Sequence, residues 1–175
     1  FSQFLIRMKR RSVNVPTLSL GYLSAIFKNE GHEVEVLTNE KDLKTDTDLF
    51  LIYSSLIEHM SEMKFSRKIK KETSAKVGFI GTFASVMPDI FIPFSDFVIV
   101  EEPEEVVKKI SKSGTIPKGL VKSSPTKDLN TLPFPDWTSF RYENFSYKHY
   151  LKESPTFPVL SSRGCPYSCA YYCPY

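Results

Sequence analysis

Three cysteines lie within a short stretch of the sequence, and the 175-residue chain contains no others. They are Cys165, Cys169 and Cys173. An odd number of thiols this close together argues against a distributed disulfide framework. Three thiolates that face one point can instead hold a metal ion or an iron–sulfur cluster. The sequence therefore predicts a metal centre here, in a reducing, cytoplasmic compartment.

Zinc is the alternative occupant of such a loop. A structural zinc site needs four protein ligands, and neither a fourth cysteine nor an adjacent histidine accompanies these three in the sequence. We expect the chain to be a fragment of a longer protein, because it begins with Phe1 and stops two residues after Cys173. A fourth ligand could then follow Tyr175.

The sequence before the cysteines alternates short apolar runs with stretches of helical periodicity. This alternation favours a parallel sheet with helices on both faces, a flavodoxin-like or Rossmann-like doubly wound α/β domain over residues 1–115. Ligands of such sheets bind at the carboxyl ends of the strands. The predicted strands are 4–7, 33–37, 48–53, 75–80 and 97–100. The predicted helices are 16–30, about 58–73 and about 101–111, and Gly31 caps the first of them. Residues 82–85 are predicted to be a loop.

Residues 116–155 have a different character and are predicted to be a linker. Prolines break regular structure there, and Gly114 does so just before it, while aromatic side chains indicate that the linker packs on a surface. Residues 157–162 then predict a strand that leads into the cysteine loop and begins a second unit over residues 156–175. The proposed aromatic anchors are Phe134, Trp137, Phe140 and Tyr142.

The charge of the chain excludes some classes of partner. Its 23 basic and 20 acidic residues give a net charge of +3, too even a balance to indicate nucleic-acid binding. We find no apolar run near the roughly 20 residues that span a bilayer, and no signal peptide. The sequence therefore predicts neither a nucleic-acid partner nor a membrane span.

The cysteine segment resembles the start of a radical S-adenosylmethionine (radical SAM) enzyme. The match runs Ser-Arg-Gly-Cys-Pro-Tyr-Ser-Cys over residues 162–169, then Tyr-Cys-Pro over 172–174. The resemblance implies that Cys165, Cys169 and Cys173 hold a [4Fe–4S] cluster at the mouth of a truncated (β/α) barrel. It also implies that SAM binds the open iron, that Tyr172 lies near its adenine, and that flavodoxin or ferredoxin donates the electron. One departure is the three-residue spacing between Cys169 and Cys173, where the family usually has two.

The preceding residues resemble the domain that carries cobalamin in many radical SAM proteins. The similar segments are 16–23, 30–34, 78–85, 96–105 and 129–135, in the order that the family has them. The resemblance implies a cobalamin site at the strand ends and methyl transfer to a small-molecule substrate that the sequence does not identify. The candidate cobalamin contacts are Ser54, Ser55, Gly81, Thr82 and Glu101.

Two departures concern this cofactor. An Asp-x-His-x-x-Gly loop that would ligate cobalt is absent from the sequence, and Glu101 and Pro103 replace family glycines. Of the three histidines, we expect His32 on the surface and His149 in a packing or solvent-facing role. His59 is the most plausible cobalamin contact, although a structural role is the simpler expectation for it.

These patterns predict the N-terminal part of a cobalamin-type radical SAM enzyme that forms a 5′-deoxyadenosyl radical. The isolated fragment is predicted to be inactive, because most of the barrel is missing. A non-catalytic cobalamin-binding or metal-binding module is the alternative.

Overall fold

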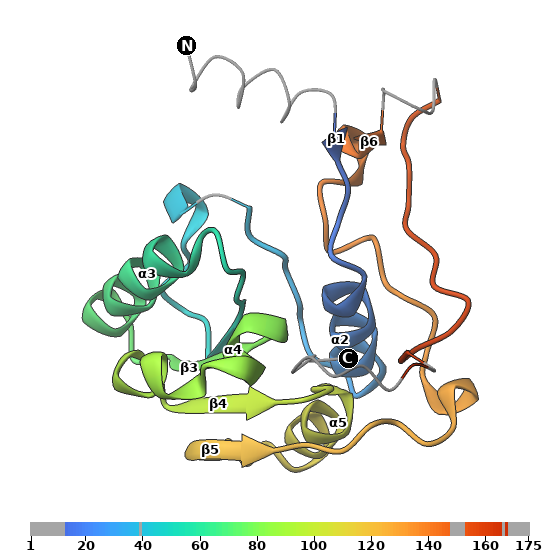
Figure 1. Ribbon diagram of the computed structural model, residues 1–175. Helices are drawn as coiled ribbons and strands as arrows, with labels where there is room; N and C mark the ends of the chain where they lie inside the picture. The colour runs from blue at the N-terminus through green and yellow to red at the C-terminus, as the bar shows by residue number, and fades with distance from the viewer. Residues whose placement is uncertain (1–12, 39, 148–152, 166, 168–175) are drawn as a thin grey trace.

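The computed structural model describes residues 13–38, 40–147, 153–165 and 167. Several predictions fall outside these residues: the strand over 4–7, His149, and three of the four residues proposed for the cluster and SAM, which are Cys169, Tyr172 and Cys173. The described residues form an α/β unit built on one parallel sheet (Figure 1).

Four parallel strands make the sheet, in the spatial order β2-β3-β4-β5. The strands β2 (Leu49–Tyr53), β3 (Lys76–Ile80) and β4 (Phe97–Val100) were each predicted from a continuous apolar run, and all three are confirmed. Such runs are typical of parallel strands that are covered on both faces. The fourth strand, β5 (Gly119–Lys122), lies beyond the predicted domain boundary at residue 115.

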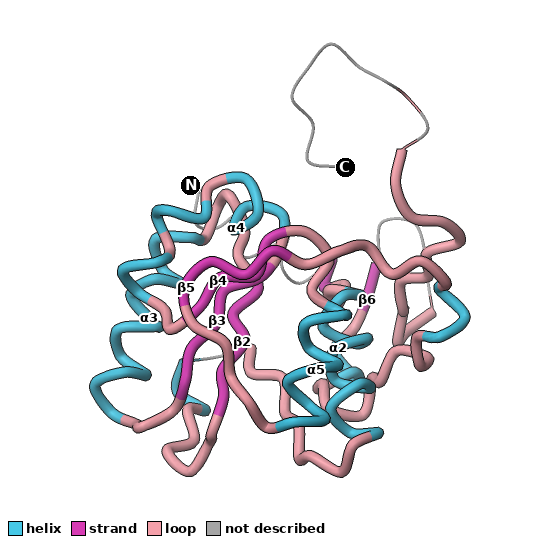
Figure 2. The backbone as a smooth tube through the Cα atoms, turned by 90° about the horizontal axis from the view of Figure 1, so that it is seen from below, coloured by secondary structure: helices cyan, strands magenta, loops and turns pink. Residues whose placement is uncertain are grey.

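Helices cover both faces of the sheet, as Figure 2 shows. On one face α2 (Leu18–Asn29) packs against α5 (Glu104–Ser113). On the other lie α3 (His59–Glu72) and the short α4 (Thr82–Val86). Each face has its own hydrophobic core, one around Ile99 and Val107 and the other around Phe79 and Phe91. The prediction of a two-sided α/β sheet is therefore confirmed at this coarse level.

Three predicted elements are wrong. Residues 33–37 form no strand. Their apolar and polar residues alternate in a loop, in which Val36 N–H donates to Ser139 O at 2.9 Å. Residues 157–162 also form no strand, and Val159 is 90% exposed. Residues 82–85 belong to α4 and not to a loop, because the left-handed Gly81 lets the chain turn from β3 directly into a helix.

Short elements complete the structure. A two-stranded antiparallel sheet pairs β1 (Val13–Asn14) with β6 (Ser146–Tyr147). This pairing brings the end of the predicted linker back beside the entry to α2. The single-turn helices are η1 (Glu40–Asp42), η2 (Pro88–Ile90), η3 (Ile92–Phe94), η4 (Leu129–Thr131) and η5 (Tyr142–Asn144).

The predicted linker packs on α2, as its aromatic residues indicated. A side chain at Gly21 would meet the Trp137 ring at 3.1 Å, so the indole lies directly on the helix backbone. Phe140 is buried and lies 5.4 Å from Trp137 between ring centroids. The prediction is wrong for Phe134, which is 95% exposed.

Candidate functional site

The carboxyl ends of the four strands meet at one edge of the sheet, hereafter the carboxyl edge. Ser54 follows β2, Gly81 follows β3, Glu101 follows β4 and Ser123 follows β5. Ser54 N–H donates to Ile80 O at 2.8 Å, which joins the first two of these turns. The structure thus brings the predicted cofactor contacts to adjoining turns on one side of the molecule.

Gly81 lets two of these turns approach closely. Its φ of +101° lies in the region that side chains rarely adopt. A Cβ added there would lie 3.1 Å from Ser54 O and 3.1 Å from the Tyr53 ring. A larger residue would therefore separate the β2 and β3 turns at the candidate site.

Glu101 adopts a left-handed conformation with φ of +70°, which is unusual for a residue other than glycine. Its N–H donates to Ser85 Oγ at 3.0 Å, and the Ser85 hydroxyl itself donates to Gly81 O at 3.0 Å. One serine thus ties the turn after β4 to the turn after β3. Glycine is the residue that this backbone conformation favours.

Glu62 is a site residue that sequence reasoning missed. Its carboxylate accepts hydrogen bonds from Ser55 N–H at 3.1 Å and from Ser55 Oγ at 3.2 Å. Burial raises the pKa of Glu62 above its usual range, although the nearby hydroxyls of Ser54 and Ser55 offset part of that effect. A carboxyl group with a raised pKa at a strand end is a candidate for proton exchange with a ligand. The signal in the sequence was a glutamate one turn into the helix after β2.

Three buried side-chain atoms have no hydrogen-bond partner of good geometry within the described residues, and all three lie at the carboxyl edge. They are Ser54 Oγ, Glu104 Oε2 and Ser123 Oγ. Leaving such an atom unpaired lowers the stability of the fold by about 1–3 kcal/mol. All three of these destabilising atoms lie at the same edge of the sheet. Unpaired polar atoms are common where a ligand supplies the missing partner.

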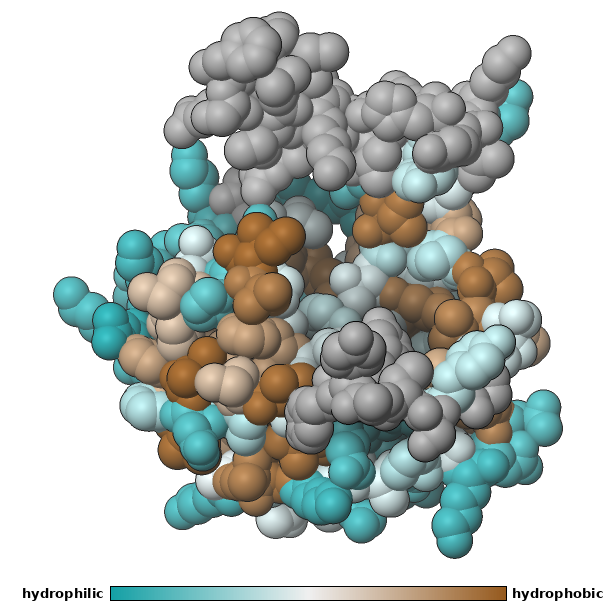
Figure 3. Space-filling view, in the orientation of Figure 1, coloured by the Kyte–Doolittle hydropathy of each residue, from teal (hydrophilic) through white to brown (hydrophobic). Residues whose placement is uncertain are grey.

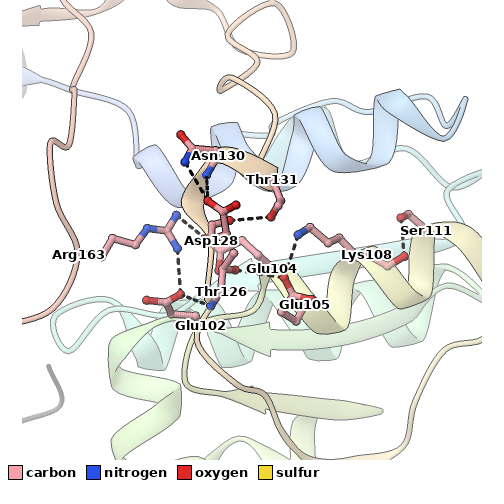
Figure 4. Close-up of polar contacts among 10 residues, drawn as sticks. All are labelled: Glu102, Glu104, Glu105, Lys108, Ser111, Thr126, Asp128, Asn130, Thr131 and Arg163. Atoms are coloured by element: carbon pink, nitrogen blue, oxygen red, sulfur yellow. Dashed lines mark hydrogen bonds and ion pairs between the residues drawn. The ribbon is translucent and has the colours of Figure 1, made fainter.

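Arg163 connects the start of the cysteine segment to this edge (Figure 4). Its guanidinium lies 2.8 Å from Glu104 Oε1 and 3.1 Å from Glu102 Oε2. Burial would lower the pKa of Arg163, but the two carboxylates raise it above its usual value. The Arg163 guanidinium also lies 5.1 Å from the centre of the Tyr22 ring, on α2. Neither the arginine nor these two acidic residues had been singled out as partners.

The proposed cluster ligands are only partly described. Cys165 is exposed, and it follows Gly164, whose φ is +81°. Within the described ranges no group of three or more His, Cys, Asp or Glu residues is arranged to hold a metal ion. Since Cys169 and Cys173 lie outside those ranges, their grouping with Cys165 remains a prediction.

Two histidines have structural contacts. His32 is exposed, as predicted, and its Nε2 lies 2.8 Å from Ser111 O, which links the ends of α2 and α5. His59 Nδ1 lies 2.8 Å from Leu56 O, and its ring packs 5.0 Å from that of Phe83. His59 therefore stabilises the start of α3, in line with the simpler expectation for it.

Hydrophobic side chains are exposed beside the carboxyl edge. Leu56 and Ile57, in the turn after β2, are 67% and 91% exposed, and Met60 in the first turn of α3 is 57% exposed. Figure 3 shows hydrophobic side chains gathered on the left half of its face, where Figure 1 places α3 and α4. A separate hollow of about 350 Å³ lies between α5 and residues 124–131. It is lined by none of the predicted contact residues.

No described helix is both long and apolar enough to cross a membrane.

No protein-family model and no curated protein matches the sequence. One solved structure that is similar to this chain is the N-terminal domain of a hypothetical protein from Thermotoga maritima. The two are 11% identical with a TM-score of 0.48, and the match covers 59% of this chain and 87% of the other.

Proposed function

We propose that this chain is the N-terminal part of a radical SAM enzyme that binds a [4Fe–4S] cluster and SAM. The observation that carries the proposal is the order of Cys165, Cys169 and Cys173 after Ser-Arg-Gly, preceded by a two-sided α/β unit. The Arg163 contacts support it, because they bring the start of the cysteine segment to the carboxyl edge. A ligand at that edge would then lie near Arg163, two residues before Cys165.

The donor set fits such a cluster. Iron–sulfur clusters take soft thiolate ligands, and three cysteines leave one iron open for SAM. When bound, the reduced cluster supplies the electron that cleaves SAM and leaves a 5′-deoxyadenosyl radical. The chain's own part is to hold the thiolates, with Tyr172 proposed beside adenine, and to receive an electron donor such as flavodoxin or ferredoxin in a cytoplasmic setting.

We further propose cobalamin at the carboxyl edge, with methyl transfer as the reaction. Ser55, Thr82 and Glu101 are at least partly exposed and can contact a ligand, whereas Ser54 is buried and can contribute only from beneath. The unpaired Glu104 Oε2 and Ser123 Oγ offer two further polar groups. Exposed Leu56 and Ile57 offer apolar surface for a large ring.

Anaerobic reconstitution with iron and sulfide tests the cluster. We expect a broad visible absorbance that dithionite bleaches, as for a redox-active iron–sulfur cluster, and its loss in each of Cys165→Ser, Cys169→Ser and Cys173→Ser. Ser168→Ala, in the same segment, is the matched control and should keep the absorbance. Stoichiometric zinc without that absorbance would contradict the proposal and favour a non-catalytic metal-binding module.

Cobalamin is tested separately with the same chain. Hydroxocobalamin should stay with the protein through a desalting column, and Thr82→Trp, which places a large ring on the exposed first turn of α4, should release it. Thr115→Trp, at an exposed threonine between α5 and β5, away from the carboxyl edge, serves as the control. Complete release of the corrinoid from the unsubstituted chain would remove cobalamin from the proposal while leaving the cluster standing.

A further inference from the structure

We propose that Arg163 is a positioning residue that fastens the start of the cysteine segment to the turn between β4 and α5. Its Nη2 lies 2.8 Å from Glu104 Oε1, and its Nη1 lies 3.1 Å from Glu102 Oε2. One cation therefore bridges two carboxylates of a single turn, as Figure 4 shows. The inference rests on the proposed function, because it gives this contact a role in placing Cys165 for cluster binding.

The contact is buried enough to fix a position. The Arg163 side chain is 16% exposed and that of Glu104 is 2% exposed. Exposed ion pairs hold their partners weakly, but separating a buried pair leaves a desolvated charge behind. Only a guanidinium can offer two separate N–H groups in a fixed fork to two carboxylates. Arg163, at the start of the segment, is thus held in one orientation as well as at one place.

The contact joins parts of the chain that are far apart in sequence. Glu102 and Arg163 are 61 residues apart, and Tyr22 under the guanidinium comes from α2. Glu102 Oε2 also accepts a hydrogen bond from Thr126 N–H at 3.2 Å, so the segment after β5 is tied to the same carboxylate. Arg163 therefore meets α2 and the β4–α5 turn directly, and the segment after β5 through Glu102.

Arg163 lies between the first cysteine and the turn that begins with a proposed cofactor contact. Cys165 follows two residues later, and the left-handed Gly164 sets the direction in which the chain leaves Arg163. The turn that holds Arg163 begins with Glu101, a proposed cofactor contact. A ligand that shifts this turn would also shift the anchor of the cysteine segment, which would couple the two proposed cofactor sites.

Energy transfer from Trp137 to an acceptor on Cys165 tests the inference. Trp137 is the only tryptophan in the sequence, and it is packed on α2 through its contact with Gly21. In a Cys169→Ser, Cys173→Ser background, Cys165 is the only thiol to label. We expect Arg163→Ala to broaden the distribution of Trp137–acceptor distances and shift its mean. Arg163→Lys, which keeps the charge without the fork, should give an intermediate distribution.

The controls separate a local change from a loss of fold. Arg141→Ala removes an exposed arginine that pairs with Asp42 at 3.1 Å and should leave the distribution unchanged. Glu102→Gln removes one carboxylate without leaving a buried charge, and it should broaden the distribution in a folded protein. Combining Arg163→Ala with Glu104→Gln should add little to either single change, because both remove one interaction. Circular dichroism checks that each variant is folded.

An unchanged distance distribution in folded Arg163→Ala and Glu102→Gln proteins would overturn the inference. The labelled protein carries no cluster, so this result does not depend on the proposed function. In the three-cysteine chain, Arg163→Ala should bind less iron than the unsubstituted chain after reconstitution. If the unsubstituted chain binds no iron, the proposed function fails while the distance result still decides whether Arg163 is the anchor.

Discussion

Asp136 Oδ2 accepts a hydrogen bond from Ser24 Oγ at 2.6 Å, across 112 residues of sequence. The same carboxylate oxygen lies 3.0 Å from Lys28 Nζ, and the Asp136 N–H donates to Gly21 O at 2.9 Å. Three positions on α2 are therefore engaged by one residue of the predicted linker. This clamp holds the aromatic segment on the helix that also carries Tyr22, one of the residues around Arg163.

Asp136→Asn should destabilise the fold at neutral pH. Burial would raise the pKa of Asp136, but hydrogen bonds from Ser139, Ser24 and other neighbours hold it well below its usual range. Hydrogen bonds to a charged group contribute about 1.5–3 kcal/mol, so we expect a loss of about 2 kcal/mol in the free energy of unfolding. Urea denaturation at pH 7 measures it.

The pH dependence gives a second readout for Asp136. Because the folded pKa lies below the unfolded value of about 4, the stabilisation is present above pH 4 and disappears as pH falls below it. The Asp136→Asn variant should lose less stability than the unsubstituted chain between pH 4 and pH 2. Asp128→Asn, whose carboxylate is exposed and pairs locally with Asn130, is the control. Equal acid slopes for the unsubstituted and Asp136→Asn chains would contradict the prediction.

Glu62 should show the opposite dependence on pH. Its folded pKa is raised by burial, so its proton favours the folded state and the stabilisation is lost as pH rises above the unfolded value of about 4. Glu62→Gln carries no titrating proton and should flatten this loss between pH 4 and pH 7. The free energy of unfolding at pH 7 should stay within about 1 kcal/mol of the unsubstituted chain, since glutamine keeps an acceptor for Ser55. A steeper loss in the variant would refute this.

Glu101→Gly should stabilise the fold. A left-handed conformation costs a residue with a Cβ roughly 1–2 kcal/mol. Glycine removes that cost, but it loses more conformational entropy on folding, which offsets part of the gain in stability. We expect a gain of about 1 kcal/mol in thermal or urea unfolding. Glu101→Ala removes the same exposed contact with Lys122 but keeps the Cβ, so it should show no gain. If both variants behave alike, backbone strain at Glu101 is not the cause.

The sequence predicted three strands of the sheet, including the outer strand β2, and missed the fourth. Continuous apolar runs located β2, β3 and β4, because a strand buried on both faces needs apolar residues at every position. Strand β5 alternates between partly buried and exposed residues and lies in a stretch interrupted by Gly114, Pro117 and Pro125, so it resembled a linker. Residues 33–37 have a strand-like alternation, but what covers them is a loop around Ser139, a contact that no local pattern encodes.

The candidate site, like the sheet, could be predicted only in part from the sequence. Ser54, Ser55, Gly81, Thr82 and Glu101 could be proposed because parallel strands end at one edge. Glu62 and Arg163 could not, since their roles depend on burial and on partners distant in sequence or across a turn. The arginine is part of the cysteine motif, yet only the fold shows that Glu102 and Glu104 receive it.

Gly78→Ala should destabilise the sheet through its neighbour on β4. Gly78 pairs in register with Phe97, and a Cβ at this glycine would overlap the Phe97 ring, which is fully buried. Forcing extra volume into a packed core costs about 1–3 kcal/mol, so unfolding in urea should occur at lower concentration. The displaced β4 would also move Glu101 away from Gly81 at the carboxyl edge, so cobalamin retention should weaken if that cofactor binds.

A double-mutant cycle identifies Phe97 as the cause. Phe97→Leu alone should also destabilise the core, because it removes buried volume. Combined with Gly78→Ala, however, the smaller leucine leaves room for the added methyl group, and the double variant should be more stable than the sum of the two losses predicts. Additive losses would mean that the space occupied by the Phe97 ring is not the cause of the destabilisation.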